Sequence, residues 1–125
     1  MKFNSIDSAI EEIKNGRCII VVDNEDRENE GDLVSASELV TPDMVNFMAK
    51  EGRGLICVTI DSKKAKSLNL EPMERKNSSL YETNFTISVD ASKNTTTGIS
   101  AFDRFETIRV ITVSYTHLTL PTTSS

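Results

Sequence analysis

The segment Asp23–Asp32 is the part of the sequence best equipped for chemistry, because it holds six carboxylates and one arginine, Arg27. Carboxylates this close together repel one another, so a bound cation would offset the repulsion. Mg²⁺ is the economical candidate, since it takes hard oxygen ligands, often one or two carboxylates plus substrate oxygens. The arginine can bind a carboxylate or phosphate through two parallel hydrogen bonds. A solvated acidic loop without any ligand is the alternative, since runs of charge are usually exposed.

Two apolar stretches flank this segment and must position it. Cys18–Val22 is a β-branched run that predicts a buried strand, and residues 33–36 predict a second strand, so together they form a hairpin-like unit. A helix precedes the first strand, because apolar residues recur at helical spacing from Ile6 to Ile13. Asn4 or Ser5 can cap this helix, and a glycine at position 16 suits its end.

The rest of the chain alternates between predicted helices and strands. Thr41 and Pro42 predict a helix start, with an end near Gly52. Downstream, the pattern predicts a buried strand over 55–60, a short helix from Asp61 through 68, a surface loop over 69–83, a half-exposed strand over 85–89 and a turn over 95–98. Ser100 and Asp103 have the spacing of a capping box that opens a last helix.

Composition excludes several classes of function. A length of 125 residues suits one domain. The net charge of −5, with scattered basic residues, argues against a nucleic-acid partner. No apolar run is long enough to span a bilayer, and the N-terminus has no signal-peptide core, so we expect no membrane association. Cys18 and Cys57 lie in apolar stretches, where reduced thiols of a cytoplasmic protein are expected.

Residues 113–125 differ in character from the rest, with no charged residue and many serines and threonines. The simplest interpretation is a flexible tail. Residues 113–122 are also similar to the in-frame translation of an adapter used in DNA sequencing libraries, so we predict a non-native tail that makes no specific packing contacts. The only histidine, His117, lies there and receives no functional role.

The segment Asp26–Leu33, directly after an apolar strand, closely resembles the signature of the 3,4-dihydroxy-2-butanone 4-phosphate synthase family. Three further segments resemble that family in the same order along the chain: 54–58, 83–90 and 96–104. The resemblance covers roughly residues 3–111. It implies an α/β fold of the α+β sandwich type, with residues 1–112 forming the N-terminal part of a truncated synthase domain.

The resemblance also implies a function. The family consists of lyases that convert ribulose 5-phosphate into 3,4-dihydroxy-2-butanone 4-phosphate and formate for riboflavin biosynthesis. They require Mg²⁺ (or Mn²⁺) and act as homodimers with the site near the subunit interface. Some members continue into a GTP cyclohydrolase II domain, and the sequence leaves open whether this protein does.

The resemblance implies roles for seven residues. Glu28 matches the metal-binding glutamate, and it also contacts substrate together with Arg27. Asp32 matches a substrate-contacting carboxylate able to transfer protons, and Glu30 matches a second acidic catalytic residue. Substrate-binding positions of less certain role are Asp23, Cys57 and Thr97. For Cys57 a small buried hydrophobic residue is the alternative, and for Thr97 an ordinary turn.

Two family features are absent from the sequence. A later Arg-x-Gly-His-Thr segment of the family supplies a second metal ligand and a phosphate-binding arginine, and a further glutamate follows it. We therefore expect the chain alone to be inactive. The competing hypothesis is a non-catalytic acidic α/β module that binds a metal or a protein.

Overall fold

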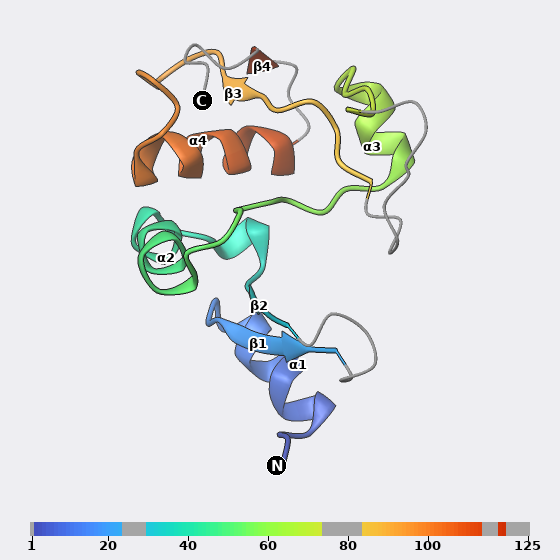
Figure 1. The fold of residues 1–125 in the computed structure, drawn as a ribbon, viewed down its shortest axis with the longest axis vertical. Coiled ribbons are helices and arrows are strands. Elements are labelled where there is room, and N and C mark those ends of the chain that lie inside the picture. Colours follow the sequence, from blue (N-terminus) through green and yellow to red (C-terminus); the bar gives the residue numbers. More distant parts are fainter. Residues whose placement is uncertain (1, 24–29, 74–83, 114–117, 120–125) are drawn as a thin grey trace. The chain divides into compact units, whose positions relative to one another are not determined.

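The computed structural model describes residues 2–23, 30–73, 84–113 and 118–119. The chain divides into two compact units, Met1–Ile56 and Cys57–Ser125 (Figure 1). Both helices and strands occur, so the predicted mixed α/β class is confirmed. Among the described residues, none of the helices is long and apolar enough to cross a membrane.

The first unit begins with helix α1 (Ile6–Lys14), as predicted. The Ser5 hydroxyl caps it by accepting a hydrogen bond of 3.1 Å from the Ser8 N–H. Gly16 ends the helical turn with a φ of 76°, a left-handed conformation that glycine adopts without steric cost. In Figure 1 the helix lies beside the strand that follows it.

Strands β1 (Ile19–Val22) and β2 (Gly31–Val34) form the predicted hairpin. They pair antiparallel, with Val22 opposite Gly31. Two details differ from expectation. The second strand begins at Gly31 rather than at residue 33, and the first strand is not buried, since the side chain of Ile20 is 69% exposed. The reason is that a two-stranded ribbon has two faces, and within this unit few elements are available to cover them.

Helix α2 (Pro42–Phe47) begins at the predicted cap, where the Thr41 hydroxyl accepts a hydrogen bond of 3.1 Å from Met44 N–H. A short 3₁₀ turn, η1 (Ser37–Leu39), precedes it. The helix then widens into a single π turn, η2 (Met48–Gly52), which the sequence did not predict. A Cβ built on Gly52 would lie 3.0 Å from Leu33 Cδ1, so glycine allows this turn to approach β2 closely.

The second unit is organised around helices α3 (Ser62–Ser67) and α4 (Ala101–Thr112). Both start where predicted: Asp61 accepts a hydrogen bond of 2.7 Å from Lys64 N–H, and the Ser100 hydroxyl accepts one of 3.0 Å from Asp103 N–H. A small core joins them, and it consists of Leu68, Leu70 and Ile111 with four half-buried neighbours, Val58, Ile60, Ala65 and Val89.

Three expectations for this unit are wrong. Residues 55–60 form no strand in the described part of the chain, although their exposure alternates as in one, because no neighbouring segment pairs with their backbone. The half-exposed strand over 85–89 is reduced to an isolated bridge between Pro72 and Thr86, followed by β3 (Asp90–Ala91). Leu70 is buried rather than part of a surface loop. Residues 74–83 of that loop lie outside the described residues.

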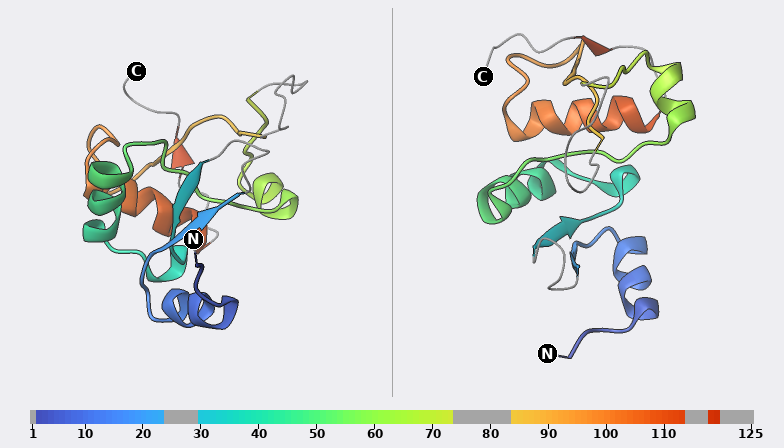
Figure 2. Two further views of the ribbon diagram at one scale, coloured as in Figure 1. Left: turned by 60° about the horizontal axis from the view of Figure 1, so that its bottom comes forward. Right: turned by 45° about the vertical axis from the view of Figure 1, so that its right-hand side comes forward.

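The last strand, β4 (Leu118–Thr119), pairs antiparallel with β3. Both strands lie along one side of α4 in Figure 1 and in the right-hand view of Figure 2. The expectation that residues 113–125 make no specific packing contacts is therefore wrong for Leu118 and Thr119, which pair with β3.

Candidate functional site

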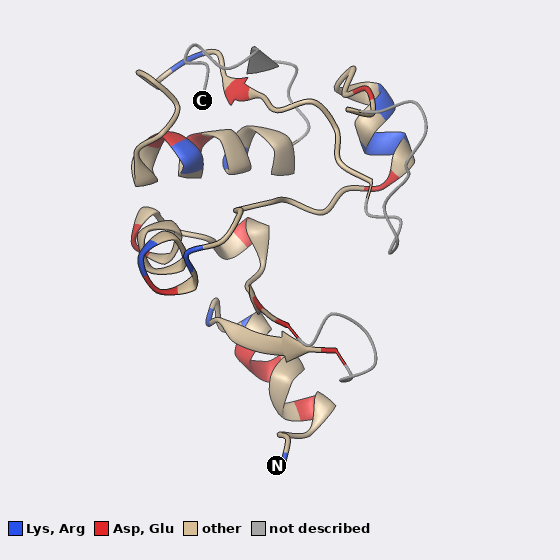
Figure 3. Ribbon diagram, viewed as in Figure 1, with Lys and Arg blue, Asp and Glu red and all other residues tan. Residues whose placement is uncertain are grey.

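Three of the predicted site residues, Asp23, Glu30 and Asp32, lie on one face of the hairpin. The ladder continues one step beyond the strands, because Asp23 N–H donates to Glu30 O over 3.5 Å and Asp23 Oδ1 accepts from Glu30 N–H over 3.4 Å. Residues directly opposite in an antiparallel pair share a face, and so do residues two apart on one strand. Asp23 and Glu30 therefore share their face with Asp32. Figure 3 shows acidic positions, in red, on both strands of the hairpin next to the segment that connects β1 with β2.

The opposite face of the hairpin is apolar. A Cβ built on Gly31 would lie 3.3 Å from Val22 Cγ1 and 3.4 Å from Ile20 Cγ2, which places these three residues together. Leu33 belongs to the same face and reaches the π turn at Gly52. The two faces therefore differ in character, and a shift of the pairing by one residue would exchange the acidic and the apolar face of a strand.

Two of these carboxylates are available for a ligand. Glu30 and Asp32 are exposed, and among the described residues no hydrogen bond or ion pair engages either side chain. Hard, solvent-accessible carboxylate oxygens suit Mg²⁺ chemically. No group of three potential metal ligands exists within the described ranges, so the metal would need ligands from elsewhere. Arg27 and Glu28, the predicted phosphate and metal residues, lie outside the described residues.

Cys57 and Thr97 belong to the second unit. Cys57 is exposed, so its alternative interpretation as a small buried hydrophobic residue is wrong. Its neighbour Val58 contacts the core instead, as alternation along an extended segment requires. Thr97 is exposed in the turn between β3 and α4.

The carboxylate of Asp103 accepts several hydrogen bonds from the turn that precedes α4. Its Oδ2 atom accepts three hydrogen bonds, from Thr96 N–H over 2.9 Å, from the Thr96 hydroxyl over 2.9 Å and from Gly98 N–H over 3.1 Å. The side chain is 3% exposed. The Thr96 N–H, above all, lowers the pKa of Asp103, although burial acts in the opposite direction. The predicted capping box is therefore only partly confirmed. The Ser100 hydroxyl accepts from Asp103 N–H, but the Asp103 carboxylate accepts from the preceding turn instead of from Ser100 N–H.

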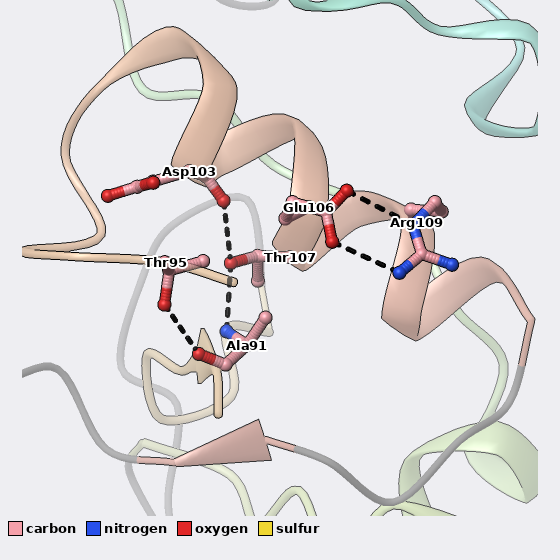
Figure 4. Close-up of polar contacts among 6 residues, drawn as sticks. All are labelled: Ala91, Thr95, Asp103, Glu106, Thr107 and Arg109. Atoms are coloured by element: carbon pink, nitrogen blue, oxygen red, sulfur yellow. Dashed lines mark hydrogen bonds and ion pairs between the residues drawn. The ribbon is translucent and has the colours of Figure 1, made fainter. Parts of the chain in front are cut away.

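A second set of contacts fixes the base of this turn (Figure 4). The Thr107 hydroxyl donates to Asp103 O over 3.1 Å and accepts from Ala91 N–H over 3.0 Å. The Thr95 hydroxyl donates to Ala91 O over 2.8 Å. Figure 4 also shows Glu106 and Arg109 joined by two hydrogen bonds further along α4, which form an ion pair.

Sequence reasoning missed the connection between Asp103 and the turn. The available signal was an acidic residue in the first turn of a helix, preceded by a run of threonines and a glycine that offer donors. That signal alone does not distinguish a bond back to the cap residue from a bond to the turn before it.

Comparison with known proteins identifies the family. The family model for 3,4-dihydroxy-2-butanone 4-phosphate synthase matches residues 7–121. The chain belongs to the 3,4-dihydroxy-2-butanone 4-phosphate synthase family. The match includes part of the segment predicted to be a non-native tail.

The relatives of this chain are considerably longer. The riboflavin biosynthesis protein RibBA of Staphylococcus epidermidis is 55% identical over 111 residues, which are 89% of this chain and 28% of that protein. A 3,4-dihydroxy-2-butanone 4-phosphate synthase of Helicobacter hepaticus is 55% identical over 116 residues, 93% of this chain and 32% of that protein. The chain thus spans about a third or less of either relative's length.

A solved structure shares the fold. It is a crystal structure of a 3,4-dihydroxy-2-butanone 4-phosphate synthase in complex with two magnesium ions. It matches with a TM-score of 0.90 and 37% identity, over 95% of this chain and 57% of that one.

Proposed function

We propose that this chain supplies part of the active site of a lyase that converts ribulose 5-phosphate into 3,4-dihydroxy-2-butanone 4-phosphate and formate in riboflavin biosynthesis. The observation that carries the proposal is the acidic face of the hairpin, where Glu30 and Asp32 of the segment that resembles the family's signature share a face with Asp23. Membership of the synthase family and the magnesium-bound relative support it.

The residue types suit the chemistry. Enolising a ketose phosphate and shifting its carbon skeleton require proton transfers beside developing negative charge on oxygen. We propose that Glu30 and Asp32 move those protons. Their carboxylates are exposed and not engaged by other described residues, which supports this role. We propose Glu28 as a ligand of Mg²⁺ (or Mn²⁺) and Arg27 as a phosphate-binding residue. The bound metal supplies charge stabilisation for oxygen anions.

Several whole-protein features belong to the same proposal. They are the complete α+β sandwich, a homodimer with the site near its interface, a cytoplasmic location, and substrate-binding roles for Asp23, Cys57 and Thr97. We also propose that residues 1–112 are the native part of the synthase domain. The contact between β4 and β3 does not require a native sequence, because backbone pairing is largely independent of side-chain identity.

The direct test is formate release. A full-length protein that contains this chain should release formate from ribulose 5-phosphate in the presence of Mg²⁺ and should stop when EDTA removes the metal. The isolated 125-residue chain should show no turnover, because its only histidine is His117 and Arg27 is the single cation in the acidic segment. Turnover by the isolated chain comparable to that of the full-length protein would contradict this.

The second candidate is a non-catalytic acidic module. It is favoured by the exposure of Glu30 and Asp32, which is equally expected of a solvated loop. Isothermal titration of the full-length protein with ribulose 5-phosphate in the presence of Mg²⁺ separates the two. The synthase should bind the sugar phosphate with dependence on Glu28, whereas a non-catalytic module, even one that binds the metal, should not.

A further inference from the structure

We propose that Asp103 is a positioning residue of the synthase, which holds the turn 95–98 so that Thr97 is presented to the substrate, without contacting substrate itself. This role rests on the proposed function, since Thr97 is a substrate-binding residue only within it. The turn and the helix that anchors it lie in one compact unit.

Asp103 accepts hydrogen bonds from the residues on either side of Thr97. One carboxylate oxygen accepts from the residue before it, Thr96, through both the backbone N–H and the hydroxyl, and from the residue after it, Gly98. The Gly98 N–H belongs to the peptide group that follows Thr97, and Thr96 is held at its N–H and its hydroxyl, so these bonds restrict the backbone on both sides of Thr97. Because Asp103 is buried and its Oδ2 already accepts three bonds, this carboxylate acts through the turn rather than on a ligand.

Further contacts constrain the two ends of the turn. Gly98 has a φ of 84°, and a Cβ at this position would overlap the carboxylate of Asp90. At its other end, the Thr95 hydroxyl binds the carbonyl of Ala91, whose N–H is bound by Thr107 on α4. The backbone of Ala91 in β3 is thus bonded both to helix α4 and to the start of the turn, and Asp103 connects the middle of the turn to the same helix.

The anchoring predicts a specific kinetic pattern. In a full-length protein that contains this chain, Asp103→Ala should lower kcat/KM by about 100-fold, because displacing a substrate-positioning group by about 1 Å has an effect of that order. The change should divide between kcat and KM as it does in Thr97→Val. The double variant should be little worse than either single variant, because both remove the same presented group.

Two further variants separate positioning from general destabilisation. Asp103→Asn keeps one acceptor oxygen, so it should retain more activity than Asp103→Ala. Glu106→Gln is the matched control, because Glu106 is also buried on α4 but bonds to Arg109 instead of the turn. It should leave kcat and KM within about twofold of the unsubstituted protein. If Asp103→Ala does not fold, Asp103→Asn replaces it in the test. The positioning role then requires that Asp103→Asn and Thr97→Val change kcat and KM in the same proportion.

Hydrogen exchange supplies a readout besides activity. In Asp103→Ala the amides of Thr96 and Gly98 should exchange faster, whereas amides in the middle of α4 should keep their protection. The positioning role alone would be overturned if a folded Asp103→Ala protein had unchanged kcat and KM. It would also be overturned if the loss of kcat/KM in the double variant equalled the product of the losses in the two single variants. Absence of formate release from the unsubstituted protein would overturn the proposed function and this role together.

Discussion

Glu30 and Asp32 on the hairpin differ from Asp103 on α4 both in exposure and in hydrogen bonding. The hairpin carboxylates are exposed and make no hydrogen bond or ion pair with other described side chains or backbone. Asp103 is buried and accepts three hydrogen bonds on one oxygen. The same side-chain chemistry can therefore serve a ligand in one unit and the fold in the other.

The comparison indicates how the surroundings of a carboxylate limit the roles that are open to it. A group already satisfied by buried donors has little capacity left for a metal or a substrate. An exposed group keeps that capacity, and the antiparallel pairing of the hairpin sets which residues share a face with it. Substitutions in the hairpin should thus act mainly on activity, and those around Asp103 on both stability and activity.

The largest effect is expected at Glu28. In a full-length protein, Glu28→Gln should lower kcat/KM by about 100-fold or more with little change in stability, because a catalytic metal contributes several kcal/mol to transition-state stabilisation. Formate release at several Mg²⁺ concentrations measures this, with Glu38→Gln as an exposed control on η1. Unsubstituted rates in the Glu28 variant at limiting Mg²⁺ would refute the metal role.

Local signals in the sequence were sufficient to predict most helices. Ser5, Thr41, Asp61 and Ser100 each cap the helix that they were expected to cap, because a cap depends on residues within one turn. The hairpin was also predictable, since two apolar runs flank one charged segment.

Features that depend on distant partners were not predictable. Residues 55–60 have the composition of a buried strand, but a strand also requires a paired neighbour that composition does not reveal. The π turn at 48–52 and the bonds from Asp103 to the turn likewise depend on tertiary contacts. For the site, the sequence identified the acidic segment. The shared face of Asp23, Glu30 and Asp32 follows from the observed strand pairing, and the Asp103 network from tertiary contacts.

The next effect in size concerns the glycines of the two regions. Gly98→Ala should lower the free energy of unfolding by about 1–3 kcal/mol, because alanine at a φ of 84° is strained and its Cβ would overlap Asp90. Gly31→Ala on β2 is the control, and it should change stability by less than about 1 kcal/mol, because alanine suits a strand and only side chains must yield. Urea unfolding measures both, and equal losses would contradict the contrast between the regions.

A smaller effect is expected from pH. The Thr96 N–H and the other donors lower the pKa of Asp103, so the folded state holds the ionised carboxylate more firmly than the unfolded state. The contribution is therefore fully present above the ordinary aspartate pKa of about 3.9 and is lost as pH falls through the lower folded value. The stability difference between the unsubstituted protein and Asp103→Asn should shrink below about pH 4. A difference that stays constant under acid would argue against the network.

The smallest effect is expected at the Glu106–Arg109 pair, which lies on the same helix as Asp103 but holds no turn. Arg109 donates from Nε over 3.2 Å and from Nη2 over 3.0 Å, and its side chain remains 44% exposed. Solvent screens such a pair, so Arg109→Ala should cost about 0.5–1 kcal/mol, the upper part arising because Glu106 is left mostly buried. Arg109→Lys should cost less, since it keeps the charge but not the two parallel bonds. Urea unfolding at low and high salt measures both variants. A loss from Arg109→Ala as large as that from Gly98→Ala would show that α4 depends on its ion pair as much as on the anchored turn.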